Sequence, residues 1–300
     1  MPTGRLPVIL DTDIGSDIDD AVALAYLLRQ PRCELVGITC VSGQVLDRAR
    51  LASAVCHAAG RDDVPIHVGA EASLLRGVRQ PRAAQAEALA QLAHRDFYPA
   101  ATAIEWLRET IHSRPGEITL LSIGPLTNVA LAFAVDPELP ALLGGYMAMA
   151  GRFLPHEAPG GFVEWNVFCD PEAGAMVYQR AADGMRSVGL DVTMRCQLAA
   201  DEVRARFQRA GGPLTPTLAM AEVWFRHGHQ VTFHDPLAAA CLFEPDLCTW
   251  REGTVEVETH GEHTAGLTHF RPGGDPVRHQ VAATVDAARF FAHYFEVVGG

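Results

Sequence analysis

Residues 8–28 constrain the fold of this 300-residue chain more than any other segment. An apolar run enters the segment, a turn containing Gly15 follows, and apolar residues at helical spacing leave it. This order predicts a buried strand, a turn and a helix. Aspartates crowd the turn, and they are Asp11, Asp13, Asp17, Asp19 and Asp20. Acidic side chains therefore collect where a strand ends and a helix begins.

The repulsion between these aspartates needs a physical remedy. The positive end of a helix dipole offers up to about 1 kcal/mol per charge, which cannot neutralise five close carboxylates. Raised pKa values, arginine partners or a divalent cation must supply the rest. A solvated acidic turn with Asp19 as a helix cap explains one or two acids. We therefore favour a site for a metal or a polyhydroxylated ligand.

The charge and composition exclude several function classes. The formal net charge is −12. Nucleic acid is therefore not an expected partner, because phosphate neutralisation needs a clustered basic face. All 24 basic residues are arginine, and the chain contains no lysine. This composition rules out Schiff-base chemistry and a phosphate-binding Walker lysine.

The cysteines and apolar runs bear on the compartment. The chain has seven cysteines, and they form no Cys-x-x-Cys pair. Buried free thiols in a reducing compartment are the plain interpretation. The first residues enter a strand too soon for a signal peptide, and no apolar run reaches the length of a membrane span. We therefore expect a cytoplasmic protein with no membrane partner.

Strand and helix patterns alternate along the chain. In the first seventy residues, strands are predicted at 8–10, 33–41 and 64–68, with a helix at 46–59 after the first helix. Such alternation is typical of a parallel sheet with helices on both faces. Further strands are predicted at 118–123, 142–150, 187–192, 253–259 and 264–270. Further helices are predicted at 100–113, 129–135, 171–181, 201–209, 218–228, 235–241 and 286–297, with an Ala-rich helix inside 71–96.

No internal repeat or linker interrupts this pattern. The fold class we predict is therefore α/β, with residues 1–300 forming a single domain. Its central sheet is mainly parallel and flanked by helices in a Rossmann-like arrangement. The Gly- and Pro-rich loop at 151–162 is long enough to be functional rather than a simple connector.

Polar residues follow several of the apolar runs. In an open parallel sheet, ligands bind outside the carboxyl ends of the strands. The segment 124–128 (GPLTN) follows one strand, Glu164 and Asn166 follow another, and His234 with Asp235 follows the apolar residues 231–233. Taken singly, these are equally well explained as helix caps, loop residues or a structural histidine. Together they predict one polar rim.

At this point the chain resembles the inosine-uridine-preferring nucleoside hydrolase family. Residues 11–20 (DTDIGSDIDD) are similar to its signature DTDPGxDDAxA, with two extra residues. Residues 124–128 match its GPLTN turn, and residues 234–236 match its HDP segment. Residues 164–173 (EWNVFCDPEA) resemble its E-[FW]-N…DPEA segment. The resemblance covers nearly the whole chain.

The resemblance implies a Ca²⁺ ion on the floor of the pocket. The ligands would be the side chains of Asp13, Asp20 and Asp235 and the main-chain carbonyl of Ile123. Such hard oxygen ligands suit Ca²⁺, which takes about six to eight of them. The implied activity is hydrolysis of the N-glycosidic bond of ribonucleosides to ribose and free base. Asp13 would deprotonate the attacking water, and His234 would be the acid for the leaving base.

The implied substrate is a small nucleoside whose ribose contacts several side chains. Glu164 and Asn166 would orient the ribose hydroxyls, and Asp17, Asp19 and Gln44 are further candidates. Stacking candidates for the base are Phe97, Trp224, Phe225, His227 and His229, although core packing is the better explanation for each aromatic. Base preference cannot be read from these residues. A homodimer or homotetramer is implied by analogy only.

Two alternatives stay open. The family has an asparagine where this chain has Gln44, and its loop asparagine is absent from residues 158–161. These departures suggest a non-hydrolytic riboside binder, or a hydrolase with an altered substrate. An aspartate-based phosphatase is weaker. It is suggested by Asp11 and Asp13 after the first strand, but Gly15 and the absence of lysine disfavour it.

Overall fold

A computed structural model describes residues 4–154, 163–274 and 278–299 of the chain. Within these residues, nine strands form a central sheet in the order β10-β9-β11-β6-β5-β4-β1-β2-β3, and β7 pairs separately with β8. The sheet strands are β1 (Leu6–Thr12), β2 (Cys33–Cys40), β3 (Ile66–Val68), β4 (Thr119–Ser122), β5 (Gly145–Met149), β6 (Met185–Val188), β9 (Cys248–Val257), β10 (Thr268–Pro272) and β11 (His279–Val285). The separate pair is β7 (Gln197–Ala199) and β8 (Gln230–Thr232).

The sheet is parallel from β3 across to β11, and β9 and β10 extend it as an antiparallel edge. The mainly parallel α/β fold predicted from the sequence is thus confirmed. Strand β1 lies between β2 and β4, where the strand order reverses. In open α/β sheets, ligands bind outside the carboxyl ends of the strands at such a switch point.

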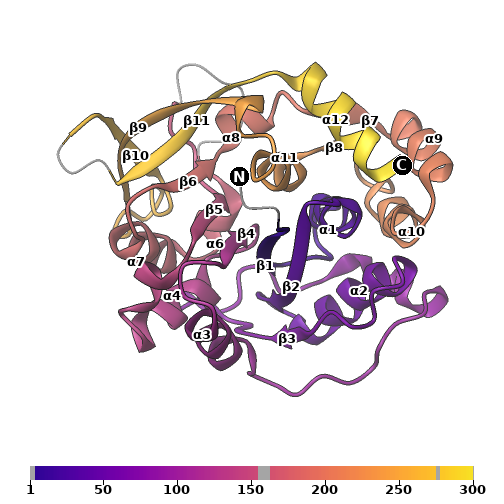
Figure 1. Ribbon diagram of the computed structural model, residues 1–300, viewed down its shortest axis with the longest axis horizontal. Coiled ribbons are helices and arrows are strands. Elements are labelled where there is room, and N and C mark those ends of the chain that lie inside the picture. The colour runs from indigo at the N-terminus through magenta and orange to yellow at the C-terminus, as the bar shows by residue number, and fades with distance from the viewer. Residues whose placement is uncertain (1–3, 155–162, 275–277, 300) are drawn as a thin grey trace.

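Helices cover both faces of the sheet (Figure 1). One face carries α1 (Asp19–Arg29), α2 (Val45–Ala58), α10 (Leu214–Trp224), α11 (His234–Cys241) and α12 (Ala287–Gly299). The other face carries α3 (Ala103–Ser113), α4 (Thr127–Val135) and α7 (Pro171–Arg180). The shorter elements are α5 (Leu139–Leu142), α6 (Trp165–Cys169), α8 (Leu190–Thr193) and the 3₁₀ helices η1 (Ala84–Gln91) and η2 (Pro245–Leu247), and α9 (Ala200–Ala210) packs beside α10.

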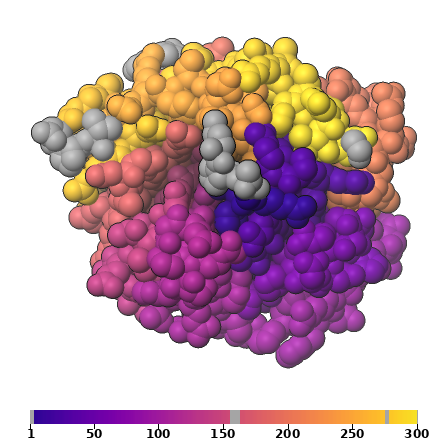
Figure 2. Space-filling model, in the orientation of Figure 1, coloured from indigo at the N-terminus to yellow at the C-terminus, as the bar shows by residue number. Residues whose placement is uncertain are grey.

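The unbroken apolar run of β1 follows from its place between these two helix layers. Successive side chains of a strand point to opposite faces. Val8 and Leu10 pack into the core on the α1 face, and Ile9 packs into the core on the α4 face. All three are fully buried. In the space-filling view, the indigo amino-terminal segment sits between the magenta middle and the yellow end of the chain (Figure 2).

Several predicted elements differ from the structure. The strand predicted at 187–192 was wrong beyond Val188, because Gly189 caps helix α8 and accepts hydrogen bonds from Val192 N and Thr193 N. The Ala-rich helix predicted within 71–96 is the 3₁₀ helix η1. Strand β11 was missed, and β10 begins at Thr268 rather than at 264.

The structure also bears on the cysteines and on membrane association. All seven cysteines are free and buried, as the sequence suggested. Within the described ranges, no helix combines the length and the apolar character needed to cross a bilayer. Most of the loop predicted at 151–162 lies outside the described residues, because these omit 155–162.

Candidate active site

A pocket of about 650 Å³ opens at the carboxyl ends of the sheet strands, at the β1–β4 switch point. It receives side chains from several distant segments, as expected for a polar rim built by a parallel sheet. The lining residues are Asp13, Ser16, Asp17, Asp19, Asp20, Arg79, Gln80, Pro81, Arg82, Ala84, Ile123, Met149, Val163, Glu164, Trp165, Asn166, Leu190, Met194, Trp224, His234 and Asp235.

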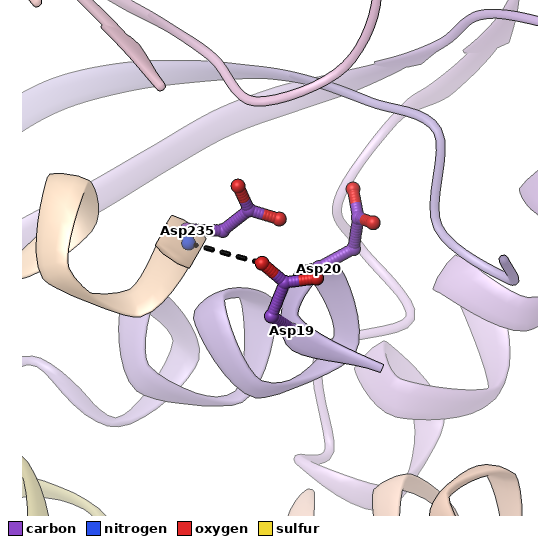
Figure 3. Close-up of side chains that lie close together, drawn as sticks. All are labelled: Asp19, Asp20 and Asp235. Carbon is purple, nitrogen blue, oxygen red and sulfur yellow. Dashed lines mark hydrogen bonds between the residues drawn. The ribbon is translucent and has the colours of Figure 1, made fainter. Parts of the chain in front are cut away.

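Three carboxylates meet where two helices begin. Asp19 and Asp20 open α1, and Asp235 lies in the first turn of α11. One oxygen from each lies within 4.8 Å of the others. The main-chain N–H of Asp235 donates to Asp19 Oδ2 at 3.2 Å, which ties the two helix starts together (Figure 3). Helix N-termini favour negative charge, so their convergence makes this cluster less costly.

Asp13 borders this triad from the end of β1. Burial is the largest cause that raises the pKa of Asp20, and the negative charge of Asp13 is the second. Gly124, just after β4, leaves room for the Asp13 side chain, because a Cβ on Gly124 would lie 2.8 Å from Asp13 Oδ1. We call Asp13, Asp19, Asp20 and Asp235 the acidic floor of the pocket.

The acidic floor is electrostatically frustrated. Burial comes first and neighbouring carboxylates second in raising the pKa values of Asp19 and Asp235 well above their usual range. Arg48 is fully buried nearby and lowers the pKa of Asp13, although burial outweighs this effect. The Arg48 guanidinium donates to main-chain carbonyls, among them those of Asp13 and Gly43, and not to a floor carboxylate. Arg48 therefore relieves the floor only in part, through its charge and not through a hydrogen bond to a carboxylate.

A divalent cation fits this donor set. Three buried carboxylates within reach of one another supply hard oxygen ligands and excess negative charge, which are what such cations require. Ile123 also lines the pocket, and its carbonyl accepts from Asn166 Nδ2 at 2.8 Å. Asp19, rather than the Asp13 of the expected ligand set, completes the triad with Asp20 and Asp235.

Glu164 and Asn166 lie at the start of α6, and both line the pocket. The Glu164 carboxylate accepts from the N–H groups of Asn166 at 2.6 Å and Gly151 at 3.0 Å. Burial raises its pKa to about 7 despite these hydrogen bonds. The amide of Asn166 also donates to Met149 O at 3.0 Å, so it joins the ends of β4 and β5.

His234 occupies the pocket wall beside Asp235. Its Nδ1 lies 2.7 Å from Thr193 Oγ1, on the helix α8 that the sequence did not predict. Burial lowers the pKa of His234 to about 4. The candidate acid is thus a neutral imidazole in this pocket.

Gln80 was not predicted from the sequence, and its side chain contacts Asp13. Gln80 Nε2 donates to Asp13 Oδ2, and Gln80 Oε1 accepts from the indole N–H of Trp165. Trp165 follows Glu164 in the EWN segment, and its side chain is half exposed in the pocket. Arg79, Arg82, Leu190 and Met194 also line the pocket and were missed. These four residues and Gln80 lie on loops or at the short helix α8, where no sequence pattern singled out a ligand contact.

Other predicted contacts lie elsewhere. Gln44 does not line the pocket, because this residue has a left-handed conformation at φ 56° and its Oε1 accepts from Ala83 N at 2.8 Å. Among the five stacking candidates only Trp224 lines the pocket, and the others are Phe97, Phe225, His227 and His229. Asp17 does line it, and burial raises its pKa to about 6. We call Gln80, Trp165, Leu190, Met194 and Trp224 the outer wall.

The polar side chains of the GPLTN turn do not line the pocket. They form hydrogen bonds with buried aspartates next to it. Asn128 Nδ2 donates to Asp11 Oδ1 at 2.7 Å, and Thr127 Oγ1 donates to Asp170 Oδ2 at 2.7 Å. Neither caps α4, so the capping interpretation was wrong. Asp11 is fully buried outside the pocket, and it also accepts from Thr39 at 2.5 Å.

A Rossmann-like sheet with a buried carboxylate cluster at its switch point has the features of a metal-dependent α/β hydrolase. The family model described as inosine-uridine preferring nucleoside hydrolase matches residues 8–292. The chain belongs to this family, whose members hydrolyse N-glycosyl bonds with the help of a metal.

Individual relatives agree with this assignment. The chain is 31% identical to the probable uridine nucleosidase 2 of Arabidopsis thaliana, over 94% of each chain. It is 32% identical to the pyrimidine-specific ribonucleoside hydrolase RihA of Citrobacter koseri, over 90% of this chain and 91% of that protein. The solved purine-preferring ribonucleoside hydrolase of Gardnerella vaginalis superimposes with a TM-score of 0.85, at 25% identity and over 98% of both chains.

Proposed function

We propose that this protein hydrolyses the N-glycosidic bond of ribonucleosides to ribose and free base, with Ca²⁺ as its metal. The observation that carries the proposal is the acidic floor, whose four buried carboxylates face the same pocket as His234. The two relatives named above act on uridine or pyrimidine ribonucleosides by their names, so uridine comes first among candidate substrates.

The cation would be held by the floor and by one strand end. Asp20 and Asp235 are the proposed side-chain ligands, with Asp13 and the Ile123 carbonyl beside them. Asp19, the third member of the triad, would add a further ligand or contact a ribose hydroxyl. When bound, Ca²⁺ would lower the pKa of a coordinated water and fix the ribose diol. Calcium suits a site of several carboxylate and carbonyl oxygens in flexible geometry.

The chain's own groups then act on ribose and water. Asp13 accepts a proton from the water that attacks the anomeric carbon. Positive charge develops on the sugar as the bond breaks, and the buried carboxylates favour that charge. Glu164, Asn166 and Asp17 are proposed to orient the ribose hydroxyls, supported by their place in the lining.

The leaving base would occupy the space beside His234 and the outer wall. An apolar and aromatic wall suits a planar base, and Trp224 is the stacking candidate supported by the lining. His234 is proposed to protonate or stabilise the base as it leaves. A reducing cytoplasmic compartment is supported by the seven free buried thiols. A homodimer or homotetramer stays a prediction.

The test is release of reducing sugar from a panel of purine and pyrimidine ribonucleosides. We expect release by the wild-type protein and a loss on the order of 10³-fold or more in Asp13→Ala. Asp62→Ala removes an exposed acid far from the pocket lining and is the matched control, with full turnover expected. Equal turnover in wild type and Asp13→Ala would contradict the proposal.

The same panel separates the riboside-binder alternative. Tight nucleoside binding with calcium present, but without release of any base, would favour a non-hydrolytic homologue. The phosphatase alternative gains no support from the family to which the chain belongs.

A further inference from the structure

The contact between Thr193 and His234 has a consequence for which ring nitrogen of the histidine carries a proton. Thr193 is fully buried on α8, and its Oγ1 lies 2.7 Å from His234 Nδ1. Among the described residues, neither the Thr193 hydroxyl nor the His234 ring has a second recorded hydrogen bond. With Nδ1 engaged by Thr193, the ring edge left to meet a ligand in the pocket is the one that carries Nε2.

The hydroxyl proton decides the direction of this hydrogen bond. A buried hydroxyl whose proton has no acceptor is destabilising. Donation from Thr193 Oγ1 to Nδ1 satisfies that proton, and it leaves a neutral imidazole with its own proton on Nε2. The reverse direction would leave the threonine proton without a recorded acceptor in the described structure, and would turn an Nε2 lone pair toward the pocket.

The segments on either side hold the two residues in register. Strands β7 and β8 pair antiparallel, with Gln197 opposite Thr232. The N–H of Phe233 donates to Cys196 O at 2.8 Å, directly before His234. At the other end of α8, the Asp191 carboxylate accepts from Phe153 N at 2.8 Å. The separation of Thr193 and His234 is therefore set by main-chain hydrogen bonds on one side and by the Asp191 carboxylate on the other.

We infer that Thr193 is a positioning residue that fixes His234 as the tautomer with its proton on Nε2, directed at the leaving base. This inference rests on the proposed nucleoside hydrolysis. It assigns a role to a residue that touches neither the ribose site nor the acidic floor.

The step it serves is balanced as follows. The bond between C1′ and the base nitrogen breaks, and its electron pair leaves with the base. The water oxygen bonds to C1′, and one water proton passes to Asp13. His234 Nε2–H donates a hydrogen bond to the departing base and stabilises its negative charge. The base then receives the proton held by Asp13 through solvent, which restores the enzyme.

The tautomer can be read directly in the wild-type protein. Nitrogen-15 chemical shifts distinguish a protonated from a lone-pair nitrogen in each histidine ring, and His234→Ala identifies the His234 signals by their loss. We expect His234 to carry its proton on Nε2 in the calcium-loaded protein, and Thr193→Val to populate the Nδ1–H form. A wild-type His234 protonated on Nδ1 alone would overturn the inference.

Kinetics test whether the tautomer matters for the reaction. Uridine needs help for its leaving base, whereas 4-nitrophenyl β-ribofuranoside releases a phenolate that needs little. We expect Thr193→Val to lower the uridine/nitrophenyl ratio of kcat on the order of tenfold or more, with KM for uridine little changed. Thr193→Ser keeps the hydroxyl and should restore most of the ratio. Equal loss on both substrates would mean a merely structural role and would overturn the inference.

A double variant closes the test. In a His234→Ala background, Thr193→Val should cause no further loss on uridine, because the histidine that it orients is gone. An additive loss would contradict the inference. Failure of the wild type on both substrates would refute the proposed hydrolysis instead, and the nitrogen shifts would still report the tautomer.

Discussion

The acidic floor and the outer wall line the same pocket but differ in how they are built. The floor consists of four carboxylates that are buried and close together, held by the end of β1 and the starts of α1 and α11. The wall consists of an amide, two indoles and two apolar side chains, from a loop and from helices α6, α8 and α10. Trp165 in this wall is 50% exposed, whereas Asp235 in the floor is 2% exposed.

This difference shows that the floor, unlike the wall, costs free energy of folding. Burying like charges is unfavourable unless a counter-charge compensates them, and within the described part of the chain no recorded hydrogen bond joins a floor carboxylate to a guanidinium. The wall makes ordinary hydrogen bonds and apolar contacts that need no ligand. Changes in the floor should therefore alter metal binding and catalysis together, and changes in the wall should alter catalysis or substrate affinity alone.

The largest effect is expected in the floor. Asp20→Ala should remove a proposed ligand, and with it several kcal/mol of transition-state stabilisation, so that uridine turnover falls on the order of 10³-fold or more. Bound calcium should fall as well. Steady-state kinetics and elemental analysis of the purified variant measure both. Full calcium content with lost turnover would separate Asp20 from the metal site.

A second prediction concerns stability and pH. Burial and mutual repulsion raise the folded-state pKa values of Asp19, Asp20 and Asp235. The calcium-free fold therefore binds more protons than the unfolded chain, and its stability falls as pH rises above the ordinary aspartate value. We expect the melting temperature of chelator-treated protein to fall between about pH 5 and pH 8, and added calcium to reverse the fall.

Asp235→Asn sharpens this stability prediction. The amide removes one repelling charge, so the calcium-free variant should lose less stability with rising pH than the wild type. It should also gain less from calcium, because a ligand has been lost. Thermal unfolding at the two pH values, with and without calcium, measures both. If the melting temperature of the calcium-free wild type did not change with pH, the repulsion inferred among the floor carboxylates would be contradicted.

A smaller effect is expected in the wall at Gln80, and Gln44, which lies outside the pocket lining, serves as the comparison. Gln80→Ala removes the contact with Asp13, and we expect kcat on uridine to fall about tenfold with calcium content unchanged. Gln44→Ala should leave KM within about twofold, because this side chain does not line the pocket and any lost contact is a weak one. A larger change in KM for Gln44→Ala would support the contact between Gln44 and the ribose that was expected from the sequence.

Among the wall variants, the smallest effect is expected for a change at Trp165. Trp165→Phe keeps a ring but removes the indole N–H that Gln80 accepts. The net value of such a hydrogen bond is about 0.5–1.5 kcal/mol, so kcat should fall roughly two- to tenfold. The same assay checks this expectation. A loss as large as that of Asp20→Ala would show that wall and floor are not separable.

Most of the acidic floor could be predicted from the sequence, because Asp13, Asp19 and Asp20 follow the buried strand β1 within a few residues. Apolar runs identified β1 and β4, and the aspartates after residue 10 stood out by their number. Asp235 was expected near Asp20 through the resemblance of residues 234–236 to the HDP segment, because it follows β8, which lies in the separate antiparallel pair and not in the parallel sheet. Membership of Asp19 in the triad required coordinates, because the turn holds several aspartates at similar spacing.

The outer wall could not be predicted in the same way. Gln80 belongs to a loop without periodicity, and nothing in its neighbours indicates that it reaches Asp13. Helix α8 was missed because Leu190 and Val192 continue the apolar pattern of β6, whereas Gly189 ends the strand. As a result, the contact between Thr193 and His234 could not be predicted from the sequence pattern.

The most direct test of the account is uridine hydrolysis by protein treated with a chelator, measured before and after Ca²⁺ is returned. The acidic floor predicts that turnover is lost without the metal and restored by calcium in the wild type, and that Asp20→Ala is not rescued. Undiminished turnover by protein shown to be free of metal would contradict the central role of the floor.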